Sequence, residues 1–256
     1  MPFPEFLYHY TSVNVLELIL QNRTIRFNSL VNMDDMEEAR TSDLGAGGKY
    51  IYISSWADDG NTENVALWGM YSNNYKGVRI RMKTDPFIHH RVGPLDYYDD
   101  PFADSVLTNE IISEKKLYLN PALPFIRRVE YTDDENLIIN SVILKEQDLR
   151  NGLVMSFNDV GRYKRDAWAP QKEVRYQFFA LPHNQEGVPI VNFNFTETGL
   201  PFSYWDASLS DEGFDSIEVT IGPKMEVEDR QRVSVLMNNC FPNGDDRIHQ
   251  SVLKIK

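Results

Sequence analysis

The stretch KEVRYQFFAL, residues 172–181, alternates polar and apolar side chains with the period of two that is typical of a β-strand. This alternation places Glu173, Arg175 and Gln177 on one face of the predicted strand and large apolar side chains on the other. A carboxylate and a guanidinium therefore share one face. They either form a surface ion pair of little energetic worth or line a cleft, and the sequence leaves both interpretations open.

Further strands and helices flank this stretch in an irregular order. Strands are predicted at residues 6–10, 24–28, 49–56, 77–82, 127–133, 216–221 and 250–256. Helices are predicted at residues 13–22, 32–40, 62–71, 135–153 and 227–238, and loops or turns at residues 85–104 and 182–215. No glycine-rich phosphate fingerprint follows the first strand. The sequence therefore predicts an α+β fold with a mixed or antiparallel split sheet and flanking helices, formed as a single domain over residues 1–256.

The composition limits the class of protein. The 256 residues include 26 Lys and Arg against 38 Asp and Glu, a formal net charge of −12. This charge argues against a protein whose resting role is to coat nucleic acid, because that role needs a basic surface. It leaves open a local basic groove or transient contact with a nucleic-acid substrate. No apolar run approaches the roughly 20 residues that span a bilayer, so no membrane association is expected. The single cysteine, Cys240, has no disulfide partner in the chain, which favours a reducing, cytoplasmic setting.

The residue types that bind metals are scattered. The five histidines form no pair at a recognised ligand spacing, so no catalytic metal is predicted. Acidic residues cluster at positions 34–38 and 96–104. Their ordinary interpretation is helix N-terminal charge and a solvated loop. A nuclease or other hydrolase that holds a divalent ion at residues 96–104 remains an alternative hypothesis.

A few polar side chains stand inside otherwise apolar strands. His9 and Thr11 lie two residues apart, so they share one face of the first predicted strand. Ser54 lies near the end of the predicted strand at residues 49–56. Small hydroxyl residues at this place are equally typical of a strand end that faces a ligand and of an ordinary turn. For His9 the alternative is a buried histidine that satisfies a backbone carbonyl.

The order of these segments resembles a bacterial family. The similar segments are YHYTS at residues 8–12, SSW at 54–56, LW at 67–68, KEVR at 172–175 and IGPK at 221–224. Together they resemble the family catalogued as domain of unknown function 2971. The resemblance extends over nearly the whole chain, and the family name supplies no activity.

A more distant resemblance does imply an activity. A His-x-Thr strand before a helix, a second strand ending in hydroxyl residues, an aromatic residue on the next helix and a late strand with a Glu are similar to ADP-ribosyltransferases of the His-Tyr-Glu type. The resemblance implies NAD as the substrate and Glu173 as the catalytic acid. It also implies that His9 and Thr11 hold the adenosine-side ribose and the neighbouring amide of NAD.

This sequence departs from that type in its aromatic residue. ADP-ribosyltransferases of the His-Tyr-Glu type commonly have a Tyr at the start of a helix. The resemblance implies that Tyr71 or Trp56 stacks on the nicotinamide, with Tyr52 and Trp68 as competing aromatic residues, and that Ser54 supports the catalytic strand. An aromatic platform suits the flat nicotinamide ring.

The implied chemistry matches these residue types. Cleavage of the bond between nicotinamide and ribose builds positive charge on the sugar, as in glycoside hydrolysis. Glu173 would accept a hydrogen bond from the ribose 2′-hydroxyl and place negative charge beside the developing cation. Arg79, Arg81 and Arg175 are candidates to bind the NAD diphosphate, since a guanidinium matches phosphate oxygens bidentately.

The expected partners follow from the resemblance alone. A transferase of this kind needs a macromolecular acceptor, protein or nucleic acid, and its biological setting would be that of a bacterial toxin or phage-defence effector with a possible antitoxin partner. The alternative is a non-catalytic domain that senses a nucleotide or pairs with a protein. The two hypotheses differ in whether NAD is turned over.

Overall fold

The computed structural model describes residues 2–60, 62–94, 102–119, 121–143, 156–183 and 202–256. Its main sheet has ten strands. These are β1 (Phe6–Thr11), β2 (Thr24–Ser29), β3 (Ile51–Ala57), β4 (Val78–Lys83), β7 (Leu117–Leu119), β8 (Phe125–Arg128), β11 (Glu173–Pro182), β12 (Tyr204–Ser208), β13 (Glu218–Ile221) and β14 (Ile248–Gln250).

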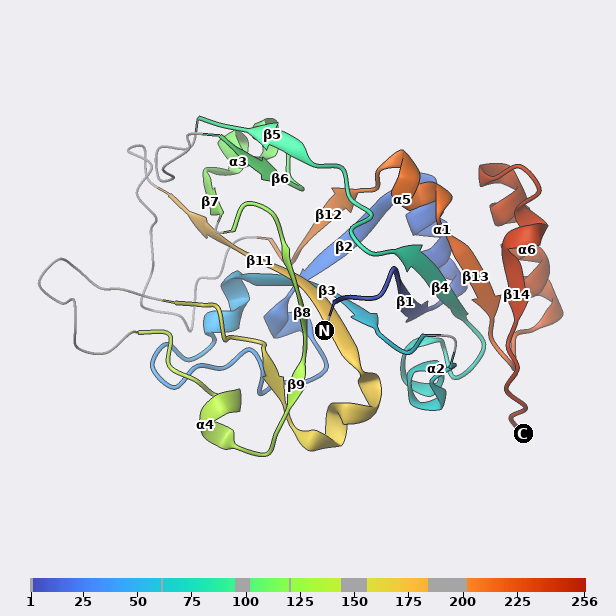
Figure 1. The fold of residues 1–256 in the computed structure, drawn as a ribbon, viewed down its shortest axis with the longest axis horizontal. Helices are drawn as coiled ribbons and strands as arrows, with labels where there is room; N and C mark the ends of the chain where they lie inside the picture. Colours follow the sequence, from blue (N-terminus) through green and yellow to red (C-terminus); the bar gives the residue numbers. More distant parts are fainter. Residues whose placement is uncertain (1, 61, 95–101, 120, 144–155, 184–201) are drawn as a thin grey trace, which may run out of the picture.

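Helices and two small sheets surround the main sheet (Figure 1). The helices are α1 (Val13–Asn22), α2 (Val65–Tyr71), α3 (Asn109–Lys115), α4 (Glu135–Ile138), α5 (Asp211–Asp215) and α6 (Val227–Cys240). Short 3₁₀ helices lie at Leu30–Asn32, Gly47–Tyr50, Asp166–Gln171 and Gly244–Arg247. The small sheets pair β5 (His90–Val92) with β6 (Ala103–Ser105) and β9 (Glu130–Tyr131) with β10 (Tyr163–Lys164).

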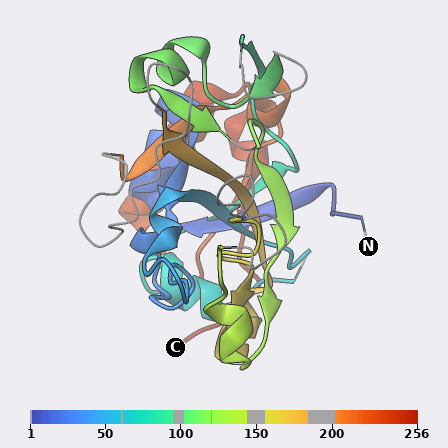
Figure 2. The ribbon, with the colours of Figure 1, turned by 90° about the vertical axis from the view of Figure 1, so that its left-hand side faces the viewer.

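The main sheet is mixed, which confirms the predicted α+β class. Its strands follow the order β12-β2-β3-β1-β4-β13-β14, and β11 pairs with β3, β7 and β8. Its pairs are antiparallel except for the parallel pair β13 and β14. Figures 1 and 2 show β11 as a long strand that crosses the molecule. No helix in the described part of the chain is long and apolar enough to cross a membrane.

The sheet splits beside β3. Along one edge β3 pairs continuously with β11, from Glu173 opposite Ala57 to Phe179 opposite Ile51. Along the other edge β2 pairs only with the start of β3 and β1 only with its end at Ala57. No strand of the described chain pairs with residues 54–56 on that edge. β1 and β2 therefore diverge around residues 54–56 and leave a wedge in the sheet.

Helix α1 joins the two diverging strands and has the bounds that the sequence predicts. Its first turn is capped by Ser12, whose Oγ accepts a hydrogen bond from the Val15 amide at 3.3 Å. Its buried face includes Leu16 and Leu20. The helix ends at Asn22, and the next residue, Arg23, adopts the left-handed conformation. Because β1, α1 and β2 are consecutive, the helix closes one side of the wedge.

Both faces of β11 are buried, the polar face included. The Arg175 guanidinium donates to the Gly161 carbonyl at 2.7 Å, and the Gln177 amide donates to the Val160 carbonyl at 3.1 Å. The segment around residues 160–161 therefore covers the polar face next to β11. The predicted alternation is confirmed, whereas a surface ion pair is wrong because Glu173 and Arg175 are both buried.

The helix predicted at residues 32–40 is wrong. The chain makes only the 3₁₀ turn Leu30–Asn32 and then a series of bends. The Asp35 carboxylate accepts from the Glu37 amide at 2.9 Å, a local bond that competes with helical pairing. Glu38 turns into the interior, where it meets Arg175. A long-range ion pair therefore overrides the local helical pattern.

The helix predicted at residues 135–153 is also wrong over its described part. It is confined to α4, and residues 144–153 lie outside the described chain. The Asp43 carboxylate accepts from the amides of Val142 and Ile143 at 3.2 and 2.6 Å. These amides are therefore engaged by a distant side chain and cannot continue a helix.

The remaining differences concern short elements. The predicted strand at 127–133 is two strands, β8 and β9, and the predicted terminal strand at 250–256 is instead β14, which ends at Gln250. The loop-like segments at 85–104 and 182–215 contain β5, β6, β12 and α5, and α3 and β7 were not predicted. The strands predicted at 6–10, 24–28, 49–56, 77–82, 172–181 and 216–221 are confirmed, as are the helices at 62–71 and 227–238, with ends shifted by a few residues.

Candidate functional site

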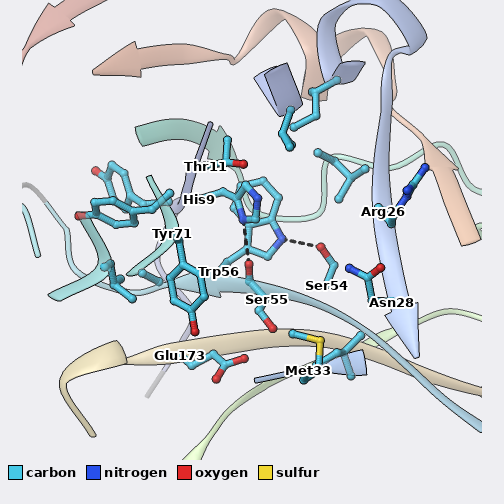
Figure 3. Close-up of a pocket in the computed structure, with 18 of the residues that line it drawn as sticks. His9, Thr11, Arg26, Asn28, Met33, Ser54, Ser55, Trp56, Tyr71 and Glu173 are labelled. Atoms are coloured by element: carbon cyan, nitrogen blue, oxygen red, sulfur yellow. Dashed lines mark hydrogen bonds between the residues drawn. The ribbon is translucent and has the colours of Figure 1, made fainter. Parts of the chain in front are cut away.

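The wedge between β1 and β2 contains a cavity of about 480 Å³. This volume falls in the range of roughly 300–1,000 Å³ that is typical of small-molecule sites. β1, α1, β2 and β3 supply most of its wall, and β11 supplies one side of it through Glu173 (Figure 3). The cavity is lined by six of the predicted site residues, namely His9, Thr11, Ser54, Trp56, Tyr71 and Glu173.

The imidazole of His9 lies against the part of β3 that has no strand partner on that edge. Its Nδ1 lies 3.0 Å from the backbone carbonyl oxygen of Ser55, on the edge of β3 where no strand pairs. A carbonyl only accepts, so Nδ1 carries the proton and Nε2 is left as an acceptor. Burial lowers the pKa of His9, and the Ser55 carbonyl opposes this only in part. The imidazole is therefore neutral at pH 7. The interpretation as a carbonyl-satisfying histidine is confirmed, and His9 also lines the cavity.

Trp56 is fixed by neighbours on three sides. Its indole Nε1 donates to the Ser54 hydroxyl at 3.1 Å. The His9 ring lies 5.3 Å from it, centroid to centroid, and Tyr176 meets it edge to face. Ser54 therefore orients the indole from the same strand.

Tyr71 enters the cavity from the end of α2. Its hydroxyl accepts a hydrogen bond from the Gln171 amide at 2.8 Å. Burial raises the pKa of Tyr71, and the nearby Asp34 carboxylate raises it further. The phenol therefore stays protonated at neutral pH and can donate. Helix α2 begins at Val65, where Asn64 accepts from the amides of the first turn.

Glu173 is held by two cations. Its carboxylate accepts from Lys164 Nζ at 2.9 Å and from Arg175 Nε at 2.6 Å. Burial raises the pKa of Glu173, but Arg175 and Lys164 outweigh burial and lower it to about 2. The residue is only 6% exposed, yet it contributes to the cavity wall. Glu173 is therefore ionised and fixed in position at neutral pH.

Glu38 completes a group of four ionisable side chains. It is fully buried and lies 2.5 Å from Arg175 Nη2 and 3.8 Å from Lys164 Nζ. Burial raises the pKa of Glu38, against the opposing effect of Arg175 and Lys164. Two carboxylates and two cations thus form a compact group behind the cavity, and both Glu173 and Lys164 line the cavity itself.

Three residues predicted to bind the diphosphate, Arg79, Arg81 and Arg175, lie away from the cavity, which corrects the prediction for them. Arg79 is buried, donates to Asp59 at 2.8 Å and covers the Tyr8 ring at 3.6 Å. Arg175 is fully buried beneath the segment around Gly161. Arg81 pairs with Glu218 at 2.8 Å. All three guanidinium groups are engaged by contacts within the protein, so none is placed to bind a diphosphate in this cavity.

The cavity also includes polar residues that the sequence analysis did not select: Arg26, Asn28, Asp34, Lys164 and Gln171. Arg26 and Asn28 carried a usable signal, because they alternate with buried residues along β2. Lys164 and Gln171 reach the cavity only through tertiary folding, which no local pattern records.

The acidic clusters do not form a metal site in the described chain. Among these residues no group of three or more His, Cys, Asp or Glu is arranged to hold a metal ion. Asp34 lines the cavity, Glu37 pairs with Arg165 and Glu38 with Arg175. The second cluster falls largely on residues 95–101, which lie outside the described chain, so the hydrolase alternative stays a hypothesis.

The middle of the chain matches a known family model. Residues 67–176 match DUF2971, described as a protein of unknown function. This part of the chain is similar to DUF2971. The matched range includes Tyr71, Lys164 and Glu173 and leaves His9 and Trp56 outside it. No significant match was found among curated proteins or among solved structures. The comparisons thus support the DUF2971 resemblance over this range and give no support to the more distant one.

Proposed function

We propose that the protein is an ADP-ribosyltransferase-like enzyme that binds NAD in the wedge between β1 and β2. One observation carries the proposal: His9, Trp56, Tyr71 and Glu173, from four separate elements, line a single cavity of about 480 Å³. A nucleotide site needs a concave, partly apolar wall with a few fixed polar groups, and this cavity has both.

The proposed step breaks the bond between the ribose C1′ and the nicotinamide nitrogen. Nicotinamide leaves with the bonding electron pair, and a nucleophile of a macromolecular acceptor bonds to C1′ and releases its proton to solvent water. Glu173 accepts a hydrogen bond from the ribose 2′-hydroxyl and faces the positive charge that develops on the sugar. Neutral His9 offers Nε2 as an acceptor to a ribose hydroxyl, and Trp56 or Tyr71 contacts the nicotinamide ring.

The test is the release of nicotinamide from NAD by the purified protein. Glu173→Gln keeps the shape of the side chain and removes its charge, so we expect release to fall roughly 100- to 1,000-fold. Glu173→Asp keeps the charge but withdraws it from the cavity, and we expect it to be nearly as impaired. NAD affinity, measured by calorimetry, should change far less than the rate does.

Glu130→Gln is the matched control. Glu130 also pairs with an arginine, Arg162, at 2.8 Å, but it lies at the surface and outside the cavity. We expect wild-type release from this variant. Wild-type release from both Glu173 variants would reject the assignment of Glu173 as the catalytic carboxylate.

A specific observation favours a second candidate, a non-catalytic nucleotide sensor. Lys164 and Arg175 both contact Glu173, so the carboxylate charge is already compensated. A compensated carboxylate stabilises a developing cation less than a free one does. Tight NAD binding without nicotinamide release would support this candidate over the enzyme.

A further inference from the structure

The cavity has few positive charges with which to bind a phosphate. Among the described residues that line it, the cationic side chains are Arg26 and Lys164, because His9 is neutral. Lys164 is 4% exposed and donates to Glu173 and Gln171 at 2.9 and 3.1 Å. Arg26 is different, since 46% of its side chain is exposed.

Arg26 already presents the geometry that phosphate binding uses. Its Nε and Nη2 donate to the two carboxylate oxygens of Asp206 at 2.8 and 2.9 Å. The two residues face each other across the β2–β12 pair, and the guanidinium lies over the Tyr204 ring at 3.6 Å. The stacking fixes the plane of the guanidinium, and a phosphate offers two oxygens at a similar spacing to a carboxylate.

The position of Arg26 separates it from the proposed reacting end. In Figure 3, Arg26 and Asn28 lie on β2, across the cavity from Tyr71 and Glu173, with Ser54 and Trp56 between them. A ligand that reaches both sides must be extended and must carry its negative charge away from Glu173. A dinucleotide with a diphosphate between two ribosides has this form.

We propose that Arg26 is the diphosphate-binding residue of the cavity and that the ligand displaces Asp206 from it. This inference rests on the proposed function for the class of ligand. Exposed ion pairs contribute little to stability, so exchanging the carboxylate for a phosphate costs little. Asp206 remains beside the phosphate and repels it, so Asp206 limits the affinity.

The test measures the affinity of ADP-ribose and adenosine by calorimetry in the full chain. ADP-ribose carries the diphosphate and has no nicotinamide to lose, whereas adenosine has no phosphate. Arg26→Ala should weaken ADP-ribose binding roughly 10- to 100-fold and leave adenosine binding unchanged. Arg26→Lys keeps the charge but lacks the planar guanidinium. Its ADP-ribose affinity should fall between those of the wild-type protein and Arg26→Ala. Asp206→Asn should tighten ADP-ribose binding several-fold.

Arg81→Ala is the matched control. Arg81 also lies on a strand, pairs with Glu218 on the neighbouring strand at 2.8 Å and covers an aromatic ring, that of Phe6, at 3.4 Å. It does not line the cavity. Removing it should therefore leave both affinities at the wild-type level.

Three results would overturn the inference: no ADP-ribose binding by the wild-type protein, unchanged ADP-ribose binding in Arg26→Ala, or an equal loss of ADP-ribose and adenosine binding. Failure of the enzymatic proposal has a different signature. If the protein releases no nicotinamide but Arg26→Ala still weakens ADP-ribose binding, the phosphate site is present and the enzymatic activity is absent.

Discussion

Glu173 lies among three charged neighbours, and its contacts predict a large effect on stability as well as on chemistry. Lys164 and Arg175 both depend on its carboxylate, and Glu38 is the other carboxylate within their reach. Removing one member of a buried charged group leaves an uncompensated charge, which destabilises far more than the intact pair stabilises.

Glu173→Gln should therefore lower the free energy of unfolding by about 3–5 kcal/mol. Glu130→Gln, which breaks an exposed pair with Arg162, should lower it by about 0–1 kcal/mol. Urea unfolding at pH 7 measures both. Equal, small changes in the two variants would contradict the buried network.

His9 predicts a pH dependence of stability. Burial lowers the pKa of the folded-state imidazole below the value of about 6.5 in the unfolded chain. The unfolded state therefore binds the proton more readily, and stability falls as the pH drops below about 6.5.

His9→Asn should remove this part of the pH dependence, measured by urea unfolding between pH 5 and 8. His249→Asn is the control, because His249 is exposed and pairs with Glu218 at 3.1 Å. If His9→Asn keeps the wild-type dependence of the unfolding free energy on pH, another group is responsible for that dependence.

At the scale of the elements, the cavity depends on the angle between β1 and β2. β1 is held on its other side by β4 along its whole length. That contact is close at Gly77, where an added Cβ would lie 2.1 Å from the Thr11 carbonyl oxygen. Thr11 lines the cavity, so packing at Gly77 sets the position of one cavity wall.

Gly77→Ala should destabilise the protein by roughly 1–3 kcal/mol and weaken ADP-ribose binding, because the β1 backbone must move. Gly69→Ala is the control, since its Cβ would meet only the flexible end of Tyr75 at 3.0 Å and alanine favours the helix. Thermal unfolding and calorimetry measure the two effects. A neutral Gly77→Ala variant would contradict the close approach.

The elements also show what the sequence could predict. The period-two sequence patterns at β2, β4 and β11 identified these strands, because successive side chains of a strand point to opposite faces of the sheet. The same alternation placed Glu173 and Arg175 on one face. It could not show that the segment around Gly161 covers that face, since the covering segment has no local signature.

The two overestimated helices failed for a related reason. Their apolar and acidic patterns suit a helix, but Asp43 engages the amides of Val142 and Ile143, and Arg175 holds Glu38 in the interior. These contacts join residues far apart in the chain. The candidate site was predicted only in part for the same reason. The sequence pattern identified strand residues such as His9, but it could not identify the residues that contact each side chain.

At the scale of the whole molecule, one wedge in a mixed sheet brings residues from positions 8 to 206 to one cavity. Figure 1 places β1, β2, β3 and β11 in the middle of the molecule, with α6, β13 and β14 at one end. A ligand in the wedge would therefore bridge strands that otherwise lack pairing to each other.

Ligand binding should protect a defined part of the molecule from hydrogen exchange. ADP-ribose should slow exchange at β1, β2 and β3, since it holds the diverging strands together, and leave α6 and β14 unchanged. Mass-spectrometric exchange with and without ADP-ribose measures this. Protection confined to α6 and β14 would place the ligand elsewhere.

The most direct test is a crystal structure with an NAD analogue in which a methylene group replaces the ring oxygen of the nicotinamide riboside, so that the reacting bond stays intact. We predict that the analogue lies in the wedge, with the diphosphate at Arg26 and the nicotinamide riboside beside Glu173 and Trp56 or Tyr71. An analogue bound outside the wedge, or a wedge that stays empty at saturating analogue, would contradict the account.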